Sequence, residues 1–237
     1  MTAPPMLNPG FERPIRSLST TRQGGLSGPP FDAFNLGLNS GDDAVIVRQN
    51  RARLSTFVPS EPCWLQQVHS TDLIHLDDWA PNVSADAAWT DRPGQVAVVL
   101  TADCLPILVA DGSGAWVAAI HAGWRGLAAG IVFQVLEQLP SAIVGMRAWL
   151  GPSIRQPAYE VGAEVIAAFA HYPNAIEANQ HGRWQLSLQR IAHAQLIEAG
   201  VQTVVDSERC TLQDSSTFFS HRRSAPCGRQ ASLIWME

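Results

Sequence analysis

Lysine is absent from this 237-residue sequence, and all 16 basic residues are arginine. Without lysine the chain cannot form a Schiff base with a carbonyl substrate, and it cannot supply the lysine of a P-loop. Arginine remains available to bind a phosphate or carboxylate through two parallel hydrogen bonds. The formal net charge is −5 and no run of basic residues offsets it, so we expect no nucleic-acid partner.

Long apolar runs are also missing. No stretch approaches the roughly 18 residues of a membrane span. Residues 1–14 are rich in proline and lack the basic start and apolar stretch of a signal peptide. We therefore expect a cytoplasmic protein with no membrane partner.

Cysteine is scarce, with four residues in the whole chain, Cys63, Cys104, Cys210 and Cys227. None of them forms a CxxC pair, so the sequence contains no zinc finger. In a cytoplasmic protein these side chains are expected to be thiols or metal ligands rather than disulfides.

The composition, 46% hydrophobic and 16% charged, is sufficient for a large core, and we expect one domain over residues 1–237 with a loose segment at 1–14. A helix is expected after Asp42 or Asp43. Further helices are expected over 127–139, 163–171 and 186–199, the last stopped by Gly200. Strands are expected over 15–20, 63–76 (one or two), 95–100, 105–110, 115–121, 147–150, 201–205 and 231–236. This order of hairpins and helical connections predicts an α+β fold with mixed β-sheets flanked by helices.

The segment HAGWRG, residues 121–126, is the most informative motif. Two glycines make it poor material for a helix or a strand, so we interpret it as a segment that brings functional groups together. Cys104 lies before one apolar strand and His121 ends the next, and a DGSG turn joins the two. Because the two arms are of similar length, a hairpin would place Cys104 and His121 at a strand spacing of roughly 5 Å. With His69 of LQQVHS, which only the tertiary fold can bring near, they would form a three-ligand metal site with an open position.

Each of these residues also has an ordinary structural interpretation. A cysteine in an apolar segment is often a small buried hydrophobe, and a lone histidine is often a hydrogen-bonded structural residue. Asp103 could be a hydrogen-bond acceptor or a base, Arg125 an ion-pair arm or an anion binder, and Trp124 is expected to pack in the core. The other five histidines are expected to be structural or on the surface, namely His75, His171, His181, His193 and His221.

A series of motifs in fixed order covers the chain from about Ser19 to Met236. These motifs are TTRQGGLSGPPFDAFNLGLNSGDD, NRARL, LQQVHS, TADCLPILVAD, HAGWRG, GPSI, YEVG, FFSHRR and GRQASLIWM. In this respect the sequence resembles the YfiH-like or laccase-domain family, formerly described as multicopper polyphenol oxidases. Family members are described as purine nucleoside phosphorylases and adenosine deaminases, and in bacteria as peptidoglycan editing factors. The fold of the family is similar to that of cysteine hydrolases.

The resemblance implies that His69, Cys104 and His121 are zinc ligands and form the catalytic centre. It implies phosphorolysis of adenosine, inosine or methylthioadenosine, and deamination of adenosine, with zinc activating water or polarising the substrate. Arg22 and Arg125 are the candidate phosphate-binding residues, and Asn35 is a candidate for a ribose hydroxyl or the base. Copper is less well supported, because seven histidines are too few for several imidazole-rich copper centres.

Two other functions remain open. Cys104 could be a nucleophile with His121 or His69 as its base, cleaving an amide in a UDP-muramoyl-amino-acid precursor of peptidoglycan. A nucleotide-binding module with a structural zinc is a third interpretation, although structural zinc usually has four protein ligands. The expected partners are a purine nucleoside and phosphate, and the expected oligomeric state is a monomer.

Overall fold

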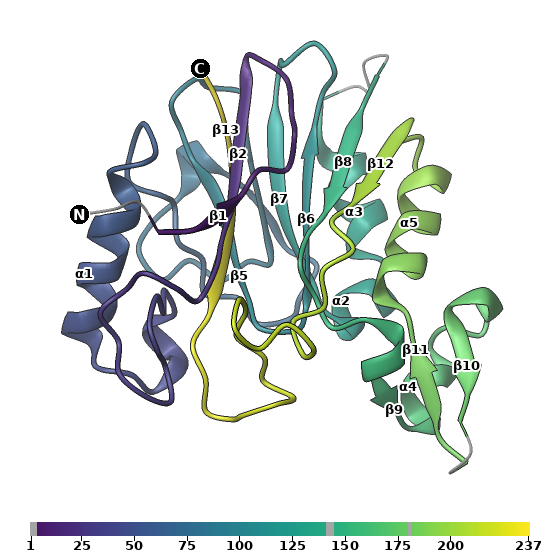
Figure 1. The fold of residues 1–237 in the computed structure, drawn as a ribbon. Coiled ribbons are helices and arrows are strands. Elements are labelled where there is room, and N and C mark those ends of the chain that lie inside the picture. The colour runs from purple at the N-terminus through teal and green to yellow at the C-terminus, as the bar shows by residue number, and fades with distance from the viewer. Residues whose placement is uncertain (1–3, 141–144, 180–181) are drawn as a thin grey trace.

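The fold is α+β, as predicted, and is built around a mixed six-stranded sheet (Figure 1). The structure is a computed structural model and describes residues 4–140, 145–179 and 182–237. The order across this sheet is β12 (Thr203–Asp206), β8 (Arg147–Leu150), β6 (Leu105–Ala110), β7 (Val117–Ala122), β4 (Ala87–Thr90) and β3 (Leu73–His75). The central pairs are antiparallel, whereas β12 runs parallel to β8 and β3 parallel to β4.

An antiparallel four-stranded sheet packs on one face of the central sheet. Its order is β1 (Met6–Leu7), β2 (Ile15–Thr20), β13 (Gln230–Met236) and β5 (Ala97–Thr101), so the last strand of the chain lies between segments from the first half. Val99 and Ile234 of this sheet are buried against Leu108 and Ala119 of the central sheet. The pairing of β1 with β2 means that residues 1–14, which we expected to be loose, contain a short edge strand.

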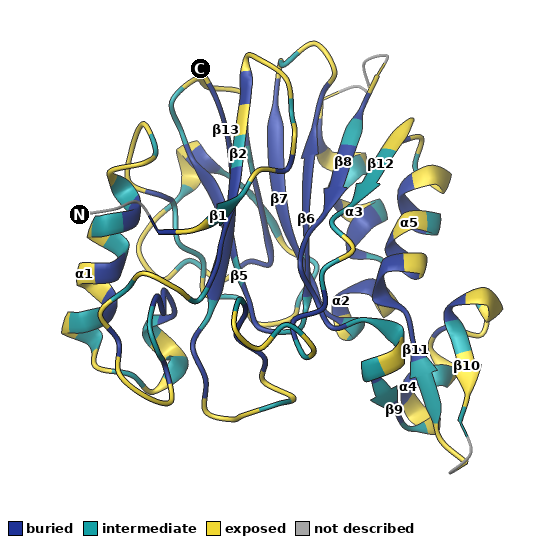
Figure 2. Cartoon of the chain, viewed as in Figure 1, coloured by how far each residue is buried: buried dark blue, intermediate teal, exposed yellow. Residues whose placement is uncertain are grey.

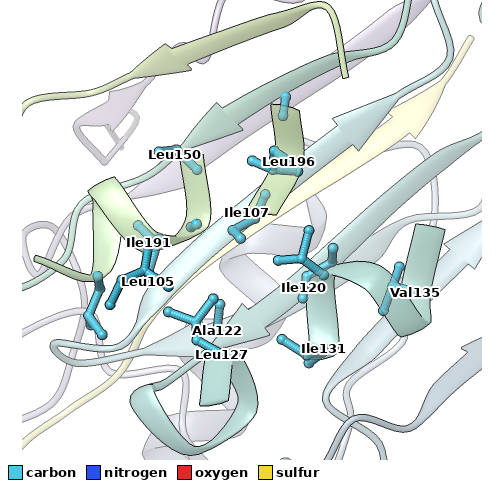
Figure 3. Close-up of a cluster of buried hydrophobic side chains, with 14 of the residues drawn as sticks. Leu105, Ile107, Ile120, Ala122, Leu127, Ile131, Val135, Leu150, Ile191 and Leu196 are labelled. Atoms are coloured by element: carbon cyan, nitrogen blue, oxygen red, sulfur yellow. The ribbon is translucent and has the colours of Figure 1, made fainter. Parts of the chain in front are cut away.

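Three helices cover the other face of the central sheet, namely α2 (Trp124–Ala128), α3 (Ile131–Gln138) and α5 (Leu188–Glu198). Figure 3 shows Ile107 and Ile120 of the sheet meeting Ile131 and Ile191 of these helices. The inner strands β8, β6, β7 and β4 are almost entirely buried, and the edge strands β3 and β12 are partly exposed. The helices alternate between buried and exposed residues (Figure 2). This pattern is expected for a sheet covered on both faces by amphipathic elements.

The remaining elements lie at the edges. Helix α1 (Ala44–Ser55) begins after Asp43, whose carboxylate accepts a hydrogen bond from the Val45 backbone amide (2.7 Å), so the predicted N-cap is confirmed. A small antiparallel sheet holds β10 (Ile176–Ala178), β11 (Trp184–Leu186) and β9 (Glu160–Val161), next to the short helix α4 (Ala163–Ala167). In the described ranges no helix is long and apolar enough to cross a membrane.

Several sequence predictions about elements were wrong. The helix expected over 163–171 ends at Ala167. The helix expected over 127–139 is two helices, because Gly130 adopts a left-handed φ of +80° and interrupts it. The first of these helices begins at Trp124, inside the motif that we expected to be irregular, with Gly123 at its N-cap position. The strands expected over 63–76 are reduced to β3 and two isolated bridges at Cys63 and Gln66.

Candidate metal centre and its cleft

The hairpin of β6 and β7 brings Cys104 and His121 together, as the sequence predicted. The register pairs Leu105 with Ala122 and Pro106 with His121, so Cys104 lies at the end of the hairpin beside His121. The DGSG turn closes the opposite end, where Asp111 accepts a hydrogen bond from the Gly114 backbone amide (2.9 Å). Local chain geometry alone therefore positions two of the three candidate ligands.

The tertiary fold brings His69 to the same point. Its Nε2 lies 3.8 Å from Cys104 Sγ, and its ring centroid lies 4.8 Å from that of His121. The ligand atoms of the three residues all lie within 4.8 Å of one another. His69 has a positive φ of +62°, an uncommon conformation for a residue other than glycine, and one that is often found at functional sites.

Gly123 of the HAGWRG motif leaves space for this cluster. A Cβ atom at this position would lie 3.0 Å from His69 Cδ2 and 3.1 Å from Cys104 Sγ. Its φ of −74° is accessible to any residue, so steric contact and not backbone conformation explains why glycine fits here. The motif therefore contributes both a ligand, His121, and the gap beside it.

Asp86 is a central residue of the site that sequence reasoning missed. Its Oδ1 lies 2.7 Å from His121 Nδ1, and its Oδ2 accepts hydrogen bonds from the backbone amides of Val68 (3.0 Å) and Ser70 (2.7 Å). One fully buried carboxylate thus fixes the His121 ring and the segment that carries His69. The segment SADAAWT gives no local signal for this role, which depends on the pairing of β4 with β7.

Close packing of these groups changes their pKa values. Burial acts to raise the pKa of Cys104, but the adjacent His121 and His69 lower it to about 6. Burial acts to lower the pKa of His121, but Cys104 and Asp86 raise it to about 9. Burial likewise opposes ionisation of Asp86, whose hydrogen bond and charge interaction with His121 lower its pKa to about 2. Each of the three pKa shifts favours the ionised form of its group, a thiolate at Cys104, an imidazolium at His121 and a carboxylate at Asp86.

The cluster lies at one end of a cleft of about 820 Å³. Around the cluster the cleft is lined by Arg125, Ile154, Tyr159, His221 and Arg222. Burial and the nearby Cys104 raise the pKa of Tyr159 to about 12. The Arg125 guanidinium lies 4.5 Å from the centre of the Trp124 ring, and Trp124 itself packs against the core as predicted.

Two substrate-binding candidates from the sequence, Arg22 and Asn35, do not line this cleft. The Arg22 side chain donates to the backbone oxygens of Asp32 (2.8 Å) and Ser215 (3.0 Å) and pairs with the Asp32 carboxylate. Both polar atoms of the fully buried Asn35 side chain are hydrogen-bonded within the protein. Both residues hold the long N-terminal loop in place.

Asp103 is also engaged within the fold. Its carboxylate accepts hydrogen bonds from the Thr211 hydroxyl (2.6 Å) and the Arg222 backbone amide (2.7 Å), which favours a structural role over that of a base. Among the other histidines, the exposed His221 lines the cleft, which the sequence did not predict. His181 lies outside the described residues.

Taken together, the fold and the site define an α+β protein with a three-ligand His–Cys–His cluster, a possible metal-binding group, at the end of an open cleft. The model of one family, described as multi-copper polyphenol oxidoreductase laccase, matches residues 16–237. The chain therefore belongs to this family, which also includes the YfiH-like proteins.

Curated relatives and solved structures agree with this assignment. The chain is 42% identical over 229 residues to "Purine nucleoside phosphorylase YfiH" of Escherichia coli K12, covering 94% of both chains. It is 41% identical over 238 residues to a Pseudomonas aeruginosa protein also named purine nucleoside phosphorylase, covering 98% of both. The crystal structure of a Neisseria meningitidis protein superimposes with a TM-score of 0.92 at 36% identity, over 98% of this chain and 99% of that one.

Proposed function

We propose that this protein is a zinc-dependent purine nucleoside phosphorylase that also deaminates adenosine. The observation that carries the proposal is the convergence of His69, Cys104 and His121 at the end of a cleft large enough for a small-molecule substrate. Relatives at 41–42% identity over nearly the whole chain are named purine nucleoside phosphorylases, which supports the same activity.

The donor atoms of the cluster fit a single zinc ion. Two imidazoles and one thiolate, with a side open to the cleft, match the three-ligand pattern of catalytic zinc rather than the four protein ligands of structural zinc. Asp86 supplies the carboxylate partner that typically orients a metal-binding histidine, and by accepting from Nδ1 it leaves Nε2 of His121 for the metal. Bound zinc would supply Lewis acidity at this end of the cleft.

Other residues of the cleft would bind the phosphate that the reaction consumes. Arg125 lines the cleft and is the candidate phosphate-binding residue in this proposal, because its guanidinium can hold two phosphate oxygens at once. His69, Cys104 and His121 would hold the metal, which would supply Lewis acidity next to the bound substrate. Arg22 and Asn35 do not contact the substrate in this proposal; they stabilise the long N-terminal loop.

A product assay tests the proposal. Purified protein should convert inosine and phosphate to hypoxanthine and ribose 1-phosphate, and adenosine to inosine without phosphate. The variant Cys104→Ser should bind no zinc and should form neither product. Failure of the zinc-loaded wild type to form either product would reject the proposal.

A second candidate function also has a specific observation in its favour. Asp86, His121 and Cys104 are arranged as an orienting carboxylate, a base and a nucleophile, which is the geometry of a cysteine hydrolase. In that case the Cys104 thiolate would attack the amide carbon of a UDP-muramoyl-amino-acid. The C–N bond would break, the amine would leave with a proton from His121, and water would then hydrolyse the acyl-enzyme. Mass spectrometry of metal-free protein incubated with this substrate distinguishes the two functions, because only the hydrolase predicts a covalent adduct on Cys104.

A further inference from the structure

The end of the cleft remote from the metal cluster has a chemistry of its own. Arg51, Glu61, Trp64 and Trp79 line this end of the cleft, and we call the region that they enclose the distal pocket. Cys63 forms a parallel bridge with Ala97, and the backbone of Leu100 hydrogen-bonds both polar atoms of the Gln67 side chain (2.7 and 2.8 Å). The chain from the distal pocket to His69 therefore runs alongside β5, which leads towards Cys104.

Arg51 presents unused donors in the distal pocket. Its guanidinium carbon lies 3.9 Å from the centre of the Trp64 ring, and its Nε donates to the Leu36 backbone oxygen (2.9 Å). Within the described part of the chain, its two terminal nitrogens have no hydrogen-bond partner. Burial lowers the pKa of Arg51 to about 10, a shift that Glu61 opposes, so the side chain is charged at neutral pH. The NRARL motif thus delivers a forked donor beside an aromatic ring.

The charge balance indicates what kind of ligand suits this pocket. Glu61 lies at the same end and accepts a hydrogen bond from Trp64 Nε1 (3.0 Å), so the acid compensates the guanidinium. Trp79 adds a second indole, held by a hydrogen bond from its Nε1 to the Trp64 backbone oxygen (3.0 Å). A compensated charge with two aromatic rings favours a neutral, flat, acceptor-bearing ring over a phosphate. The other end, with Arg125 and Arg222, is better suited to an anion.

We propose that the distal pocket binds the purine base and that Arg51 selects 6-oxopurines by donating to O6 and N7. A guanidinium only donates hydrogen bonds, and O6 and N7 of hypoxanthine and guanine are adjacent acceptors that match its fork. Adenine carries a donating amino group at position 6, so it offers Arg51 only N7. This inference rests on the phosphorolysis half of the proposed function, because that reaction takes a purine nucleoside.

Calorimetric binding of free bases tests this assignment on the zinc-loaded protein. Hypoxanthine should bind about tenfold or more tightly than adenine, and 7-deazahypoxanthine, which lacks the N7 acceptor, should bind more weakly than hypoxanthine. Arg51→Met should abolish the preference for hypoxanthine while zinc content stays unchanged. Arg48→Met, the same substitution at an exposed position of α1, is the matched control and should retain the preference.

The binding measurements test the base pocket, and the phosphorolysis assay tests the proposed function, so the two can fail independently. A preference for hypoxanthine that survives Arg51→Met, equal binding of hypoxanthine and its 7-deaza analogue, or no binding of either base would overturn the assignment. The deaza comparison uses the wild type, so the test stands even if the Arg51 variant does not fold. If the bases bind as expected but inosine is not phosphorolysed, the proposed function fails and the base pocket stands.

Discussion

Asp86 Oδ1 lies 2.7 Å from His121 Nδ1, and the other oxygen of the same carboxylate holds the backbone on both sides of His69. One buried acid therefore orients two candidate metal ligands that are far apart in the sequence. This contact links the central sheet to the chemistry of the cleft, because β4 follows Asp86 directly and pairs with the strand that carries His121.

Replacing Asp86 should weaken metal binding more than it weakens the fold. Asp86→Asn keeps the size of the side chain but removes the charge that favours the His121 tautomer with Nε2 free. We expect zinc affinity to fall roughly 10–100-fold, as measured by competition with a chelator. Asp72→Asn, at an exposed position nearby, is the control and should bind zinc normally. Unchanged affinity in Asp86→Asn would remove Asp86 from the metal site.

Gly123→Ala should disturb the cluster because the added methyl group would contact His69 and Cys104 at about 3 Å. The backbone there tolerates alanine, so the protein should fold, while zinc affinity should fall roughly tenfold or more. Gly126→Ala is the matched control within the same motif, since its Cβ would have no neighbour closer than 3.5 Å. Equal zinc affinity in the two variants would contradict the steric role of Gly123.

Thiol alkylation of the metal-free protein should report the low pKa of Cys104. The thiolate forms above a pKa of about 6 instead of the ordinary 9.0, so the Cys104 alkylation rate should rise through pH 6 and level off near neutrality. Cys63, whose pKa burial raises, is an internal control and should react only at high pH. Zinc should protect Cys104. A Cys104 rate that rises only above pH 8 would contradict the thiolate–imidazolium arrangement.

Arg125→Lys should impair phosphate use, because lysine loses the two-point contact of the guanidinium. We expect the KM for phosphate in inosine phosphorolysis to rise roughly tenfold, with zinc content unchanged and adenosine deamination reduced much less. Arg22→Lys should instead lower thermal stability, since Arg22 donates to Asp32 and Ser215 backbone oxygens and does not line the cleft. A normal KM for phosphate in Arg125→Lys would reassign that residue.

The parts of the site that follow from local geometry could be predicted from the sequence. The DGSG turn and its two apolar arms predict the hairpin, and the hairpin alone brings Cys104 to His121. Asp86 could not be predicted, because its role depends on which strand β4 pairs with, and Arg222 reaches the cleft from a loop near the end of the chain.

A polar loop residue that stabilises its own loop is difficult to interpret from sequence alone. Arg22 and Asn35 lie in a loop rich in glycine and proline, and such residues are hard to distinguish from ligand-binding ones until their hydrogen-bond partners are known. The interruption of the helix at Gly130 was missed for a related reason, since a single glycine is compatible with a helix until its φ is known to be positive.

Titration of metal-free protein with zinc, with inosine phosphorolysis measured at each step, shows whether the His69–Cys104–His121 cluster is the catalytic centre. Activity should be negligible without metal, rise in proportion to added zinc, and reach its plateau at about one zinc per chain, because the described residues offer one three-ligand cluster. Full activity in the metal-free protein, or a plateau that requires several metal ions per chain, would contradict this assignment.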